Sequence, residues 1–143
     1  MKTMTEKFKI LAEFIKDMSS ETPDIQSYLF VKENMSKYNL NIDIKSNALK
    51  NKLIGIDITL KFEDKELNEK KSHFEITYTT IVKIEDSVKD KKDLEKIILC
   101  DVPTNVYPRL EKVFINLLTD SGFPGIKFEK KINFEKLYKE KSN

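Results

Sequence analysis

The sequence predicts an α+β fold in which a four-stranded antiparallel sheet carries helices packed on one face. The first observation is the alternation in residues 73–84 (HFEITYTTIVKI), where even positions are apolar except Thr80 and odd positions are polar except Ile81. Successive side chains of a strand point to opposite faces, so this segment has one apolar and one polar face. The same phase runs through 53–62 and 38–45, which is typical of an antiparallel meander with one face in water.

The first strand is less clearly marked. Residues 7–18 fit a helical stripe and a strand equally well. A strand is favoured because the meander can accept a fourth member and because the following SSETPD has strong loop chemistry. Residues 19–38 are predicted to be irregular although they carry large apolar side chains, and 63–71 form a charged loop.

Helical patterns follow the strands. A short helix is predicted around Leu94–Ile98, ending near Val102-Pro103, and a longer one starts around Pro108. Its apolar residues occupy more than one stripe, which predicts burial on more than one side. The segment 121–125 (SGFPG) ends this helix, and a final helix is predicted at 134–141.

A length of 143 residues predicts a single domain, residues 1–143, of ordinary size. Hydrophobic residues make up 39% of the chain and charged residues 35%, so we expect the sheet to complete its burial against another subunit. The net charge of +2 makes no case for nucleic acid. One cysteine, no apolar secretory core near the N-terminus and no run of ~20 apolar residues predict a cytosolic protein without membrane insertion.

No constellation for catalysis is recognisable. His73 is the single histidine, and Cys100 is expected to be a small core residue. Three glycines cannot build a phosphate-binding loop, and the strand carboxylates Asp43, Asp57 and Glu75 fall on the polar face. We therefore expect a binding protein with no catalytic, metal or cofactor residues.

Three motifs resemble the protein-export chaperone family SecB. They are FIKDMSSETPD (14–24), PTNVYPRLEKVFINLLTDSGFP (103–124) and INFEKLY (132–138), in the family's order. The resemblance implies an ATP-independent chaperone, a cytosolic homotetramer built as a dimer of dimers, that binds unfolded preproteins and delivers them to the SecA motor.

The resemblance also implies site residues. The subunit interface would use strand and helix residues Phe74, Ile76, Tyr78, Leu110, Phe114 and Leu117. SecA docking would use the acidic residues Asp17, Glu21 and Glu75. Departures from the family include the slightly basic charge and His73 in place of a large apolar residue.

The resemblance further implies a substrate groove lined by the 19–38 segment and the terminal helix. Its candidates are the aromatic and methionine residues Tyr28, Phe30, Met35, Tyr38, Phe134 and Tyr138. Met and aromatic side chains can re-pack around many clients. The alternative is that several of them cap the subunit's own core.

Three other functions remain open. A SecB-like chaperone dedicated to a toxin–antitoxin pair would share the fold and grooves. A small-ligand carrier would need a closed cavity in each monomer, and an enzyme would need the constellation that is missing.

Overall fold

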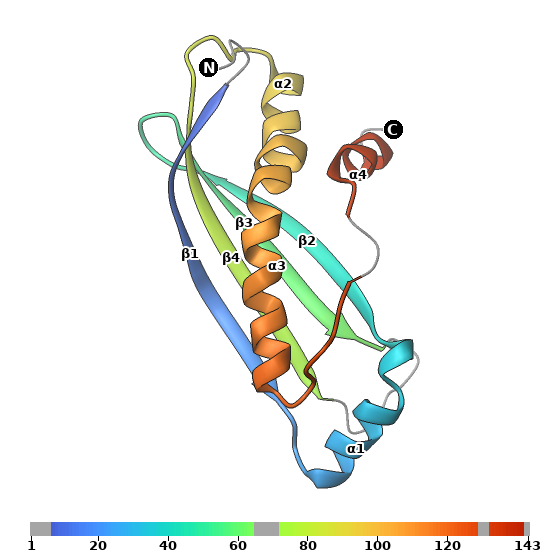
Figure 1. Cartoon of the computed structure of the whole chain (residues 1–143). Coiled ribbons are helices and arrows are strands. Elements are labelled where there is room, and N and C mark those ends of the chain that lie inside the picture. Colours follow the sequence, from blue (N-terminus) through green and yellow to red (C-terminus); the bar gives the residue numbers. More distant parts are fainter. Residues whose placement is uncertain (1–6, 65–71, 129–131, 142–143) are drawn as a thin grey trace.

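The computed structural model describes residues 7–64, 72–128 and 132–141. The sheet consists of β1(Phe8–Glu21), β2(Asn39–Ala48), β3(Leu53–Glu63) and β4(His73–Ile84) in the order β1-β4-β3-β2. All neighbouring strands are antiparallel, and the sheet is long and twisted (Figure 1). The predicted four-stranded antiparallel sheet is confirmed, including the strand at the N-terminal end.

The strand register confirms the predicted division into two faces. Paired positions share a face, and Ile58 with Tyr78, Leu60 with Ile76 and Phe62 with Phe74 form successive apolar rows. Thr59 and Thr77 form a pair on the opposite face, where their hydroxyls are hydrogen-bonded at 2.9 Å. Strand β1 follows β4 along its whole length but is interrupted at residues 11 and 16, where the register shifts.

Residues 91–120 form one continuous helix rather than the two separate helices predicted. It runs through α2(Lys91–Lys96), the π-helical turn η2(Ile97–Asp101) and α3(Val102–Asp120) (Figure 1). The predicted break near Val102-Pro103 and the start at Pro108 are therefore wrong. Pro103 lies in the first turn of α3, where its missing N–H is tolerated, and Pro108 lies inside the helix.

The segment between β1 and β2 is also more regular than predicted. It contains α1(Ile25–Glu33) and the 3₁₀ turn η1(Met35–Lys37). The Asp24 side chain caps α1 by accepting a 2.7 Å hydrogen bond from the Ser27 backbone N–H. The prediction of an irregular segment at 19–38 is therefore wrong for residues 25–33, because this local cap starts a helix directly after Pro23.

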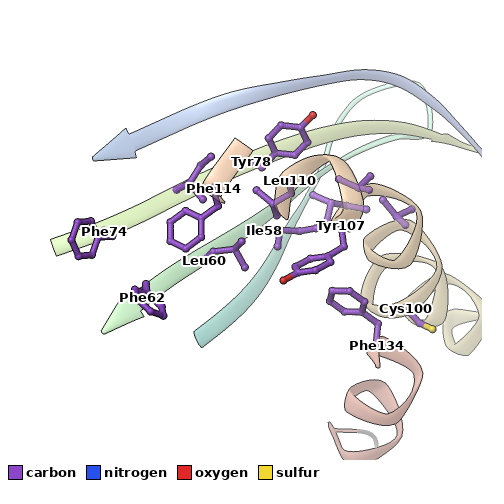
Figure 2. Close-up of a cluster of buried hydrophobic side chains, with 14 of the residues drawn as sticks. Ile58, Leu60, Phe62, Phe74, Tyr78, Cys100, Tyr107, Leu110, Phe114 and Phe134 are labelled. Carbon is purple, nitrogen blue, oxygen red and sulfur yellow. The ribbon is translucent and has the colours of Figure 1, made fainter. Parts of the chain in front are cut away.

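The core lies between the apolar face of the sheet and α3 of the same chain. The buried residues of α3 form one broad stripe: Val102, Pro103, Val106, Tyr107, Leu110, Phe114 and Leu118. Within a single chain the helix is thus buried on one side, not on several as predicted. Figure 2 shows Phe114 and Leu110 pointing at Ile58, Leu60 and Tyr78. The apolar face needs no second subunit for this burial.

After α3 the chain turns back along the helix and ends in α4(Phe134–Lys141), whose predicted bounds are confirmed. The returning segment packs aromatic rings into the core. Phe123 meets Phe74 edge-on at 5.6 Å between centroids, and Phe128 meets Phe62 at 5.7 Å. This packing fixes the segment between α3 and β2 (Figure 1).

Candidate functional site

Helix α1 carries the most exposed large apolar side chains of the described residues. Ile25 is 74% exposed and Leu29 is 51% exposed. They are four positions apart and therefore lie on the same side of the helix. Sequence reasoning missed both, because the segment was predicted to be irregular; the signal was the capping Asp24 followed by apolar residues at helical spacing.

Helix α1 is held on the body of the protein by Tyr28. Its hydroxyl donates a 2.7 Å hydrogen bond to the Gly122 carbonyl, and its ring stacks on Phe123 at 5.0 Å. Gly122 has φ of 104°, and a Cβ there would lie 2.6 Å from Tyr28 Cε1. Glycine is required at this position both by the left-handed backbone and by the closeness of the tyrosine ring. These contacts hold α1 in a fixed position on the protein, with its exposed side facing solvent.

The six predicted groove residues divide into two classes. Tyr38 and Phe134 are buried: Tyr38 packs on Phe62 at 5.3 Å, and Phe134 on Tyr107 at 5.6 Å. Tyr28, Phe30, Met35 and Tyr138 are half-buried. The structure therefore places the first two in the chain's own core, as the alternative interpretation held, and leaves four at the surface.

A further apolar row lies along β2. Leu40, Ile42 and Ile44 face the core side and are half-buried. Strand β2 is an edge strand, so the backbone groups on its open side have no partner within the sheet. An extended peptide could use both features, with backbone hydrogen bonds at the edge and apolar contacts beside it.

A cleft of about 560 Å³ lies where η2 meets the start of α4. It is lined by residues of η2, of the first turn of α3, and of α4 with the two residues before it: Cys100, Asp101, Thr104, Ile132, Asn133, Phe134 and Glu135. Cys100 is buried, as predicted, and burial together with the Asp101 carboxylate raises the pKa of its thiol. A thiol that is buried and kept protonated has the properties of a core residue, not of a nucleophile.

The predicted interface residues lie in the interior of the chain. Phe74, Ile76, Tyr78, Leu110 and Phe114 are buried against one another, and Leu117 is half-buried. The large apolar side chains that remain exposed in the sheet are instead on the edge strand β1: Leu11, Phe14, Ile15 and Met18. The apolar pattern of β1 was recognised, but its exposure was not.

A polar cluster ties β1 to α3. Arg109 donates two hydrogen bonds of 2.8 Å to the Glu13 carboxylate, and the Tyr78 hydroxyl donates a third of 3.0 Å. The hydrogen bond from Arg109 lowers the pKa of Glu13. Burial raises the pKa of the Tyr78 hydroxyl, and its hydrogen bond to the Glu13 carboxylate raises this pKa further. The cluster fixes the edge strand against the helix and keeps Glu13 ionised.

The three predicted docking carboxylates come together on the polar face. Ser19 pairs with Glu75, so Asp17 and Glu21, two residues to either side of Ser19, flank Glu75 on that face. Glu75 also lies 3.6 Å from His73 Nε2 and 3.7 Å from Lys61 Nζ. The strand register thus puts the three carboxylates on one face as an acidic cluster, with His73 and Lys61 at its border; their role in docking stays a prediction.

Deeper in the polar face, Asp57 is held by two donors. Thr79 Oγ1 donates a 2.6 Å hydrogen bond to it, and Lys16 Nζ a 3.0 Å hydrogen bond. Burial opposes ionisation, but these hydrogen bonds outweigh it and lower the pKa of Asp57. Asp57 therefore belongs to a hydrogen-bond network that stabilises the polar face of the sheet.

Residues 7–64, 72–128 and 132–141 contain no group of three or more His, Cys, Asp or Glu side chains arranged to hold a metal ion. No helix in the same ranges is long and apolar enough to cross a bilayer.

The fold and these surfaces define a protein that exposes apolar side chains on α1 and β1 and carries three carboxylates on the polar face of its sheet. The family model for the preprotein translocase subunit SecB matches residues 1–143. The chain belongs to the SecB family, a family of chaperones and not of enzymes.

Relatives agree with this assignment. A protein of Pelagibacter ubique (strain HTCC1062), provisionally named protein-export protein SecB, is 61% identical over 140 residues, covering 98% of this chain and all of that protein. A protein-export protein SecB of Bradyrhizobium sp. (strain BTAi1 / ATCC BAA-1182) is 22% identical over 134 residues, covering 94% of this chain and 81% of that protein.

A solved structure has a similar fold. It is the Mycobacterium tuberculosis Rv1957 SecB-like chaperone in complex with a ChAD peptide from the Rv1956 HigA1 antitoxin. The TM-score is 0.64 at 9% identity, and 88% of each chain is covered. The predicted family and fold class are confirmed by these comparisons.

Proposed function

We propose that this chaperone holds unfolded preproteins on apolar surfaces, without ATP, and passes them to the SecA motor. The observation that carries the proposal is the exposure of Ile25 and Leu29 on a rigidly attached helix. Exposed apolar side chains that serve no internal packing are typical of a surface that binds other proteins. Membership of the SecB family supports the same conclusion.

The client would lie in an extended form over separate apolar elements. Helix α1 with Phe30 and Met35 is one such element, and the β2 row Leu40, Ile42 and Ile44 is another. Binding one polypeptide at several weak places raises the overall affinity through effective concentration. No ATP is needed for such holding, and the three glycines of the sequence form no nucleotide-binding loop.

A homotetramer, a dimer of dimers, would multiply these surfaces. We place the first subunit contact at the open edge of β1, because Leu11, Phe14, Ile15 and Met18 are exposed there. A copy of the chain docked on this edge would cover the four side chains and could pair the free backbone of β1. Of the predicted interface residues, Leu117 would lie at the border of this contact. The others would act only indirectly, by packing in the core behind the contact: Phe74, Ile76, Tyr78, Leu110 and Phe114.

Delivery requires a surface that the client does not occupy. Asp17, Glu21 and Glu75 lie on the polar face of the sheet, opposite to the face covered by α3. A basic surface of SecA would recognise this acidic cluster by charge complementarity, which speeds the encounter, and a positive charge placed in the cluster would oppose binding.

The test of holding activity uses a denatured preprotein diluted into buffer without ATP. The wild-type protein is expected to delay refolding or suppress aggregation. Ile25→Ser combined with Leu29→Ser should weaken client binding by about tenfold, since the apolar area that these two exposed side chains bury against the client is lost. The matched control is Leu49→Ser, an equally exposed leucine at the other end of the sheet. Equal loss in the control, or no delay by the wild type, would refute the proposal.

The test of delivery is SecA binding measured by calorimetry at low salt. Glu75→Lys reverses the charge at the centre of the acidic cluster and should reduce the affinity at least tenfold. Asp43→Lys, the same reversal on the polar face of β2, serves as the control and should retain binding. Robust SecA binding that Glu75→Lys leaves unchanged would show that the docking face is assigned wrongly.

A second candidate is a SecB-like chaperone dedicated to one toxin–antitoxin pair. The fold it shares with the Mycobacterium tuberculosis chaperone favours this candidate. The two functions differ in client range, so a dedicated chaperone would leave unrelated preproteins to aggregate in the first assay.

A further inference from the structure

Positive charge gathers at one end of the molecule. We define this basic end as residues 7–9, 45–54 and 81–93, which are the start of β1, the β2–β3 turn with its flanks, and the end of β4 with the start of α2. These ranges hold nine lysines and four carboxylates, a surplus of five positive charges. The whole chain has a net charge of +2, so the remainder of the sequence is net negative.

Hydrogen bonds and strand pairing bring the three ranges together. The Glu85 N–H donates to the Lys7 carbonyl at 2.9 Å, and the Ile84 N–H donates to the Lys52 carbonyl at 3.2 Å. On the polar face, Lys83 pairs with Lys9 of β1 on one side and with Leu53 of β3 on the other. Figure 1 shows these segments meeting at the end of the sheet opposite to α1.

The pairing of Lys9 with Lys83 places two like charges directly opposite each other, which is unfavourable for folding. Both side chains are exposed, and among the described residues no carboxylate lies within ion-pair distance (4.0 Å) of either one. A negatively charged partner would relieve the repulsion. The arrangement therefore favours binding to an anionic surface.

Apolar side chains lie among these lysines on the same face. Leu49, at the β2–β3 turn, is 47% exposed and lies over Gly55: a Cβ added there would be 3.9 Å from Leu49 Cδ1. Leu53 and Ile81 are half-buried beside it. Ile81 is the one apolar residue among the odd-numbered positions of β4, which form the polar face. The turn is kept tight by positive φ at Asn51 and Lys52.

We propose that the basic end binds the surface of a lipid bilayer that contains anionic phospholipids. The lysines would lie among the headgroups, and Leu49 would enter the boundary with the acyl chains. A nucleic-acid partner is disfavoured because the basic end has no arginine and its one aromatic residue, Phe8, faces the core side. Binding there would hold the chaperone at the membrane independently of SecA.

The test is flotation of the intact protein with vesicles of phosphatidylcholine containing phosphatidylglycerol, compared with vesicles of pure phosphatidylcholine. We expect binding to the anionic vesicles alone, weakening as salt is raised. Lys9→Gln, Lys50→Gln and Lys83→Gln combined should weaken it by about fivefold for each lysine, or roughly a hundredfold. Lys32→Gln, Lys37→Gln and Lys127→Gln, the matched control outside the basic end, should weaken it far less.

A second variant distinguishes lipid from other anions. Leu49→Ser should weaken vesicle binding by about tenfold through lost apolar contact while leaving the charge unchanged. Absence of binding to anionic vesicles, equal losses in the two lysine triples, or tighter binding to a uridine homopolymer than to the vesicles would each overturn the proposal. Circular dichroism and native mass of every variant confirm that the fold and assembly are intact.

Discussion

Strands β1 and β4 are paired along their whole length and both carry large apolar side chains, yet these side chains have opposite environments. On β4, Phe74, Ile76 and Tyr78 are at most 8% exposed beneath α3. On β1, Phe14, Ile15 and Met18 are 44–45% exposed. The difference arises from position: β4 is central and lies under the helix, whereas β1 is at the edge of the sheet.

This contrast shows that an apolar pattern identifies a face to be buried but not what buries it. The face of β4 is completed inside the chain, and its side chains contribute to folding. The exposed side chains of β1, Phe14, Ile15 and Met18, contribute little to folding of one chain and are available to a second copy.

The largest effect is expected in the core. Phe74→Ala removes a ring that is 1% exposed and packs on Phe123, so it should lower the free energy of unfolding by about 4 kcal/mol. Urea denaturation at fixed protein concentration measures this loss. A loss below about 1 kcal/mol would contradict the assignment of β4 to the core of the single chain.

The next effect concerns assembly through β1. Ile15→Ser combined with Met18→Ser should raise the dissociation constant between subunits by roughly a hundredfold, because apolar area covered in the assembly is lost. Native mass spectrometry over a dilution series detects the shift from tetramer to smaller species. The control is Ile25→Ser with Leu29→Ser on α1, which should leave the mass unchanged; a wild-type protein that is monomeric would refute the role of β1.

A smaller effect is expected where β1 is tied to α3. Glu13→Gln removes the charge that accepts two hydrogen bonds from Arg109, at a cost of about 1.5 kcal/mol in unfolding free energy. Arg109 lowers the pKa of Glu13 below its ordinary value of 4.5. The stabilisation is therefore complete at pH above 4.5 and is lost as the pH falls through the lowered pKa.

Urea titrations across the acidic range test this pH dependence. The wild type should lose its advantage over Glu13→Gln as the carboxylate is protonated. A difference between the two proteins that stays constant from neutral pH to well below 4.5 would mean that ionised Glu13 is not the stabilising species.

The smallest effect is expected at the attachment of α1. Tyr28→Phe keeps the stacking on Phe123 but removes the hydrogen bond to the Gly122 carbonyl, which should cost about 1 kcal/mol or less. Hydrogen exchange of the α1 amides should become faster while the rate at β4 stays the same. Unchanged exchange in α1 would show that other contacts hold the helix.

The sequence allowed the sheet, its two faces and the terminal helix to be predicted, because alternation in strands such as 73–84 is a local property. The clustering of Asp17, Glu21 and Glu75 was also predicted. Helix α1 was missed because the capping side chain of Asp24 was given no weight beside loop-forming residues. Strand order decides that β1 is an edge and β4 is covered, and this information is not contained in the periodicity of either strand.

The central claim is that the exposed apolar side chains belong to interactions with other chains: β1 with a second copy and α1 with an unfolded client. Hydrogen exchange on the intact protein, with and without an unfolded preprotein, tests it most directly. We expect slow exchange along β1 before the client is added, and exchange in residues 25–33 that slows when it is added. Rapid exchange along β1 in the free protein, or residues 25–33 unaffected by excess preprotein, would contradict the account.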